Sequence, residues 1–186
     1  MPMIIVLDCL AWVFFHLLAG YVAWRIPASA FAKDNPLFRL RPCEENGVFH
    51  RRFFFVHRWK RYLPEAGGFF PRGFSKRHLT SLNTDYLNVF IAETRRGEFS
   101  HWLSIVPAPF FFLWNVWFVG VCMIVYALLF NLPFIAINRF NRGRLIHAWS
   151  LACRRDLRRG SGIPDEATLS GSKDRGINAP CNASAR

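Results

Sequence analysis

The sequence predicts a mainly α, small integral membrane protein with an N-terminal transmembrane helix, a cytoplasmic amphipathic region and a C-terminal apolar helical hairpin. Hydrophobic residues make up 52% of the 186 positions, yet the formal net charge is +12. The charges are segregated, because residues 3–24 carry only Asp8 and residues 102–137 carry none. Such runs are too long for a soluble core and their flanks are basic, which indicates a membrane. No nucleic-acid-binding motif is visible, so we expect no nucleic-acid partner.

Residues 1–24 are predicted to form the first transmembrane helix. The apolar stretch 3–24 would rise roughly 33 Å as a helix, enough for a hydrocarbon core of about 30 Å. The alternative is a cleaved signal peptide, since residues 28–30 (Ala-Ser-Ala) resemble a cleavage site. The chain start lacks Lys and Arg, however, and the apolar stretch is longer than a typical signal core. We expect Asp8 to be a solvated carboxylate near the interface and His16 to bond to a neighbouring helix.

Residues 25–101 are predicted to form a polar, amphipathic catalytic region. Cations and aromatic rings mix over residues 53–62, which suits the headgroup layer, although inward-packing aromatics explain the mixture equally well. Asn83, Thr84 and Asp85 predict the start of a helix, because such side chains cap exposed amide groups.

Residues 102–137 are predicted to form a membrane hairpin. As one straight helix these uncharged residues would run about 54 Å, far more than a bilayer needs. We place the turn at residues 115–120. All Lys and Arg lie in residues 25–101 or after residue 137, so both polar regions should be cytoplasmic and the protein a multi-pass protein of the cell membrane. A single kinked crossing is the alternative.

The C-terminal part divides into two predicted segments. Residues 138–159 form a basic juxtamembrane segment. Residues 160–186 are rich in Gly, Ser, Asp and Pro and are predicted to be a disordered tail.

Candidate catalytic residues gather before the long uncharged run. At the helical period Glu93, Glu98 and His101 share one face, and His101 falls at the predicted water boundary. A carboxylate-held imidazole can take a proton from a hydroxyl that attacks an acyl carbonyl, and His78 is a second candidate base. A metal site would need a second Glu-x-x-His, which the sequence lacks. Ordinary surface polarity is the remaining interpretation.

Arginines next to these residues admit two interpretations. Arg95 and Arg96 are typical of solvated cations or lipid-phosphate contacts. Alternatively they bind the phosphates of an acyl carrier such as coenzyme A, together with Arg139, Arg142 and Arg144. No Gly-x-Ser-x-Gly, phosphate loop or dinucleotide fingerprint is present, so a covalent serine mechanism has no support.

The sequence resembles the glycosyl-4,4'-diaponeurosporenoate acyltransferase family over about residues 25–145. Each matching motif is short, but their order and spacing are specific. The matching positions are Arg25-Ile26-Pro27, Trp59-Lys60, Arg77-His78-Leu79, Asn83-Thr84-Asp85, Glu93-Thr94, Arg96, Glu98, His101, Trp102, Ser104, Pro107, Asn131, Pro133, Arg139, Asn141-Arg142 and Arg144-Leu145. Gly143 stands where a proline is expected.

This resemblance implies an acyltransferase that esterifies a sugar hydroxyl of a glycosylated C30 carotenoid, the last step of staphyloxanthin-type synthesis. It implies no cofactor; acyl-CoA or acyl carrier protein is the donor substrate, and membrane lipid and other carotenoid-pathway enzymes are further partners. We expect His101 or His78 to be the base, oriented by Glu98 or Glu93. The residues that would bind substrate are Asn83, Thr84, Asp85, Arg96, Arg139, Arg142 and Arg144. The rivals are another glycolipid acceptor and a non-catalytic adaptor that binds anionic lipid.

Overall fold

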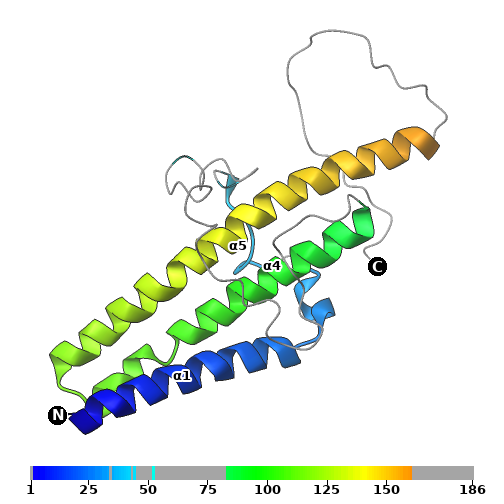
Figure 1. The fold of residues 1–186 in the computed structure, drawn as a ribbon. Coiled ribbons are helices and arrows are strands. Elements are labelled where there is room, and N and C mark those ends of the chain that lie inside the picture. Colours follow the sequence, from blue (N-terminus) through cyan, green and yellow to red (C-terminus); the bar gives the residue numbers. More distant parts are fainter. Residues whose placement is uncertain (1, 34, 43, 45–51, 53–82, 161–186) are drawn as a thin grey trace.

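The structure is a computed structural model, and it describes residues 2–33, 35–42, 44, 52 and 83–160. The described part is mainly α and contains no strand, which confirms the predicted class. In chain order the elements are α1 (Pro2–Arg25), the short 3-10 helix η1 (Ala28–Phe31), α4 (Thr84–Ile105), the 3-10 helix η5 (Ala108–Leu113) and α5 (Trp117–Gly160) (Figure 1). The aromatic and basic stretch at 53–62, His78 and the predicted disordered tail after residue 160 lie outside the described residues.

The three long helices lie side by side with alternating directions. α1 and α5 begin at the same end of the bundle, and α4 runs against both (Figure 1). The chain therefore doubles back between α4 and α5, at residues 106–116, and not at 115–120 as predicted. Pro107 and Pro109 interrupt the helix here, because proline lacks an amide donor and disfavours helix at the preceding residue. Gly120, which we placed in the turn, lies inside α5.

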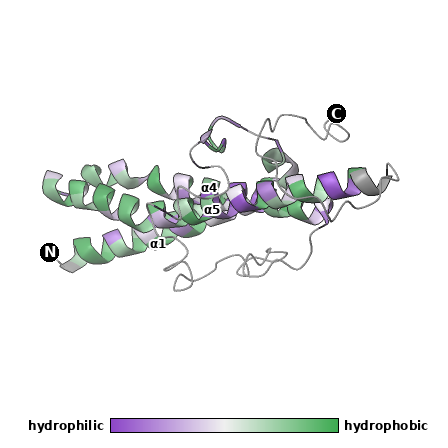
Figure 2. Ribbon diagram, turned by 90° about the horizontal axis from the view of Figure 1, so that it is seen from above, coloured by the Kyte–Doolittle hydropathy of each residue, from purple (hydrophilic) through white to green (hydrophobic). Residues whose placement is uncertain are grey.

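Within the part of the chain that the structure describes, two helices are long and apolar enough to cross a membrane, Met3–Arg25 and Trp117–Leu157. Their apolar side chains point outward to an unusual extent: Met3 is 84% exposed, Trp117 72% and Leu129 70%. Hydrophobic residues dominate the end of the bundle that contains the N-terminus, and hydrophilic residues gather toward the other end of α4 and α5 (Figure 2). Apolar surface of this size is typical of a protein that contacts lipid or a partner.

At the apolar end of the bundle, a buried carboxylate of α1 forms hydrogen bonds with the chain reversal. Asp8 is 4% exposed, and its Oδ1 accepts hydrogen bonds from Trp114 Nε1 and Asn115 Nδ2, both at 2.8 Å. Our expectation of a solvated Asp8 is therefore wrong. The chain reversal folds back over the start of α1 and supplies two donors, which replace water as partners of the carboxylate.

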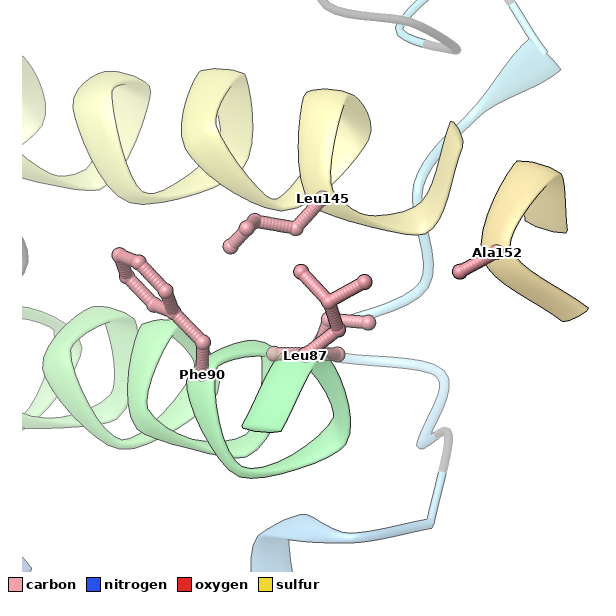
Figure 3. Close-up of a cluster of buried hydrophobic side chains, with 5 residues drawn as sticks. Leu87, Phe90, Leu145 and Ala152 are labelled. Atoms are coloured by element: carbon pink, nitrogen blue, oxygen red, sulfur yellow. The ribbon is translucent and has the colours of Figure 1, made fainter. Parts of the chain in front are cut away.

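The polar end of the bundle has its own apolar core between α4 and α5. Leu87, Phe90 and Ile91 of α4 meet Leu145 and Ala152 of α5 (Figure 3). α5 continues through Pro133 and past the last apolar residue of the long run, so the predicted basic segment after residue 137 belongs to the same helix. One rigid element thus connects the apolar end of the molecule to the polar end.

Candidate active site

Glu98 lies at the centre of the site, in the middle of α4, and its side chain is fully buried. Arg139 Nη1 donates to its Oε1 at 2.7 Å, and Arg142 Nη2 lies 2.7 Å from its Oε2. Trp102 Nε1 also donates to Oε1, at 3.3 Å. Both arginines come from α5, so this one carboxylate ties the two helices together. A buried ion pair stabilises only where its geometry is good and further hydrogen bonds satisfy the charges.

The two arginines extend the network to residues 38–44. Arg139 Nε and Nη2 donate to the carboxylate of Glu44, at 3.0 and 2.8 Å. Arg142, which is itself fully buried, donates from Nη2 to the carbonyl of Phe38 at 2.7 Å. We call Glu44, Glu98, Arg139 and Arg142 the carboxylate–arginine cluster. Through these contacts Phe38 and Glu44, which precede Glu98 by more than fifty residues, are held against α4 and α5.

Arg95 adds a third guanidinium next to the carboxylate–arginine cluster. It lies close enough to Arg142 for the two charges to interact. Arg95 is 6% exposed and donates from Nη1 to the carbonyls of Phe31 and Ala32, at 2.9 and 2.8 Å. The expectation of a solvated Arg95 is therefore wrong, because the chain after α1 folds over it. Among the described residues, the guanidiniums of Arg139 and Arg142 bind carboxylates, whereas that of Arg95 binds backbone carbonyls.

His101 lies one turn after Glu98, on the side toward the chain reversal. Its Nδ1 is 3.0 Å from Asn131 Oδ1, and its ring stacks on Phe134 with a centroid distance of 4.8 Å and an interplanar angle of 11°. Asn131 is fully buried and donates from Nδ2 to the carbonyl of Ala127 at 2.9 Å. That bond orients the amide so that Oδ1 faces the imidazole. We therefore assign the proton to Nδ1 and the lone pair to Nε2, the atom that can act as a base.

The structure does not join His101 to Glu98 as we expected. The contacts of Glu98 are to Arg139, Arg142 and Trp102, and none is to His101. Both side chains lie on the face of α4 that packs on α5. The α5 residues opposite Glu98 are arginines, whereas the α5 residue opposite His101 is Asn131. The imidazole therefore contacts Asn131 of α5 and not Glu98.

The remaining predicted site residues lie at several places. Glu93 pairs with Arg96 at 2.6 Å, and Arg96 also donates to the carbonyl of Ile26 at 3.3 Å. Asn83 caps α4 by accepting from the amide of Asp85 at 3.0 Å, which confirms the predicted helix start. This cap with Thr84 and Asp85 lies about 22 Å along the helix from Glu98, so it is not part of the same site.

Two further observations bear on ligand binding. Arg144 is exposed, and its guanidinium lies 5.7 Å from the centroid of the Phe140 ring. In the part of the chain that the structure describes, no three His, Cys, Asp or Glu side chains gather as metal ligands.

Sequence reasoning missed Asn131 and Glu44 as site residues. Asn131 had a usable signal, because a lone amide in a long apolar run is expensive in a membrane unless it has a role. Glu44 had no such signal in the sequence, since its partner Arg139 is 95 residues away.

The contacts of Glu98 within the carboxylate–arginine cluster predict that this residue is a major determinant of stability. Glu98→Ala leaves Arg142 and Arg139 buried without their carboxylate and should destabilise the fold by roughly 3–5 kcal/mol. Thermal unfolding of the purified protein in detergent, followed by tryptophan fluorescence, measures the change. The matched control is Asp156→Ala, an exposed carboxylate on α5, which should change stability by less than about 0.5 kcal/mol. Equal unfolding temperatures for the two variants would contradict the assignment.

Comparisons with known proteins identify the family of the chain. The pattern that defines the glycosyl-4,4'-diaponeurosporenoate acyltransferase family matches residues 27–150. A protein of that name from Staphylococcus haemolyticus (strain JCSC1435) is 35% identical over 153 residues, covering 79% of this chain and 85% of its own. Its namesake from Staphylococcus aureus (strain N315) is 31% identical over 147 residues, covering 79% and 88%. No solved structure matches the chain. The family inferred from the motifs is thereby confirmed: the chain belongs to the glycosyl-4,4'-diaponeurosporenoate acyltransferase family and is an acyltransferase.

Proposed function

We propose that the chain esterifies a fatty acyl group onto a sugar hydroxyl of a glycosylated C30 carotenoid, at the boundary between membrane and water. The observation that carries the proposal is the position of His101. Its imidazole, oriented by Asn131, lies between the carboxylate–arginine cluster and the apolar end of the bundle. A base at this level reaches a polar sugar whose apolar chain stays in lipid. The relatives' name supplies the acceptor.

The proposed reaction needs one proton carrier. Nε2 of His101 takes the proton of the sugar's primary hydroxyl as its oxygen attacks the carbonyl carbon of an acyl thioester. The tetrahedral intermediate collapses with cleavage of the C–S bond, and the departing thiolate takes the proton back from the imidazolium. The products are the sugar ester and the free thiol. Holding both apolar substrates beside the same helix provides the catalytic gain through proximity.

The helix directions support the proposed placement in the membrane. α1 and α5 start together at the apolar end, and their first 20 or so residues each match a hydrocarbon core of about 30 Å. Arg25 ends α1, and Arg139 follows the apolar part of α5, so both basic ends lie on one side. We assign that side to the cytoplasm by the positive-inside rule, with α4 entering from there and the chain reversing at residues 106–116.

The donor in this proposal is a fatty acyl thioester of coenzyme A or of acyl carrier protein. Arg139 and Arg142 are engaged by carboxylates, so the exposed arginines of α5 are better placed to meet an anionic carrier. These are Arg144, Arg154 and Arg155. Their guanidiniums suit phosphate or carboxylate groups arriving from water.

Loss of the base should abolish product without loss of the protein. In cells that supply the glycosylated carotenoid, His101→Ala should insert normally and leave that carotenoid unacylated, whereas His147→Ala, an exposed histidine of α5, should give normal product. Mass spectrometry of extracted lipids measures both and identifies the true acceptor. Full acylation by a His101→Ala and His78→Ala double variant would eliminate histidine base catalysis. An acylated glycolipid other than the carotenoid would overturn the proposed acceptor.

The role of Asn131 can be separated from a packing role. Asn131→Leu removes the acceptor that holds Nδ1–H and should lower kcat at least about tenfold with little change in KM, because the wrong tautomer becomes accessible. Asn131→Asp keeps an acceptor at the same place and should recover most of the rate. The measurement is acyl transfer by purified protein in lipid nanodiscs. Equal rates for the Leu and Asp variants would show that the amide only fills space.

A further inference from the structure

A row of aromatic rings leads away from His101 along α5. Tyr126, Phe130 and Phe134 are spaced four residues apart, which places them on one helix face. Ring centroids are 5.6 Å apart for Tyr126 and Phe130, and 6.0 Å apart for Phe130 and Phe134. Phe134 is the ring that stacks on His101. The row therefore ends at the proposed base.

α1 adds two rings to this row. Trp12 lies 5.1 Å from Tyr126, and His16 lies 5.3 Å from Phe130, both between centroids. Trp12 and His16 also stack on each other at 5.5 Å. We expected His16 to bond to a neighbouring helix, but its Nε2 is buried with no hydrogen-bond partner among the described residues. Its contact with α5 is made by the ring. We call Trp12, His16, Tyr126, Phe130 and Phe134 the aromatic ladder.

The aromatic ladder is packed on its inner side and open on its outer side. Trp12 is 7% exposed, whereas Tyr126 is 41% and Phe130 46% exposed. The exposed side chains of α1 are mostly aliphatic by contrast. Examples are Ile5, Leu10, Val13 and Leu17. An aliphatic surface suits saturated lipid, while a strip of ring faces and edges offers stacking geometry to another flat π system.

We propose that the aromatic ladder binds the conjugated polyene chain of the acceptor. This inference rests on the proposed function, because it takes the acceptor to be a glycosylated carotenoid. From Tyr126 to Phe134 the helix rises about 12 Å, and the row then reaches His101. A polyene lying along the ladder brings its glycosyl end to the imidazole. A saturated acyl chain fits the same surface but forms no ring stacking, so the ladder selects the acceptor over bulk lipid.

The test compares two ligands that carry the same sugar, the C30 carotenoid glycoside and a saturated alkyl glycoside. The full chain is placed in nanodiscs of saturated phosphatidylcholine. Quenching of tryptophan fluorescence gives the Kd of the carotenoid glycoside, and competition gives that of the alkyl glycoside. A Tyr126→Leu and Phe130→Leu double variant should raise the first Kd about three- to tenfold and the second less than about twofold. Phe118→Leu, an exposed aromatic of α5 that is not in the ladder, should change neither.

The outcomes separate this inference from the proposed function. The control is a double variant whose unfolding temperature equals that of the native protein. If its Kd rises equally for both ligands, or for neither, the polyene site is overturned. If the double variant unfolds at a lower temperature, the single variant Phe130→Ile replaces it, and the two Kd values are compared in the same way. Because binding is measured without turnover, selective weakening supports the ladder even if acyl transfer to the carotenoid is absent, a result that would overturn only the proposed function.

Discussion

The ion pairs of Glu98 with Arg139 and Arg142 set the register on which the rest of the molecule depends. They join the middle of α4 to the middle of α5 through side chains that are almost or fully removed from solvent. With this register, His101 faces Asn131 and Phe134, and the reversal at residues 106–116 closes over the start of α1. A shift of one turn would leave buried charges unpaired, which makes alternative packings expensive.

The same arrangement orders the described residues from a polar end to an apolar end. The capped start of α4 and the basic part of α5 are polar, the carboxylate–arginine cluster follows, then the imidazole, and finally apolar helices closed by the Asp8 hydrogen bonds. In the proposed function, an acyl donor carried in water meets an acceptor carried in lipid where the polar and apolar parts join. The family membership shows that the chain is an acyltransferase.

The class, the long apolar helices, the start of α4 at Asn83 and the family were predictable, because they depend on composition, period and local capping. The partners of Glu98, Asp8 and His101 were not. Arg139 is 41 residues from Glu98, and Trp114 is 106 residues from Asp8. A helical pattern tells which face a residue occupies, but not which residue of another helix lies opposite. Asp8 and Arg95, which we expected for this reason to be solvated, are buried and hydrogen-bonded.

The proposed function requires His101 to lie at the cytoplasmic boundary of the membrane, and the depth of a spin label at this position tests that requirement. A single cysteine replaces His101 in a chain whose other cysteines are changed to serine, and the labelled protein is placed in vesicles. The account predicts a label near the headgroup boundary, on the same side as Arg144, with a label at Ser104 deeper. A label at position 101 near the bilayer midplane, or on the side opposite Arg144, would contradict it.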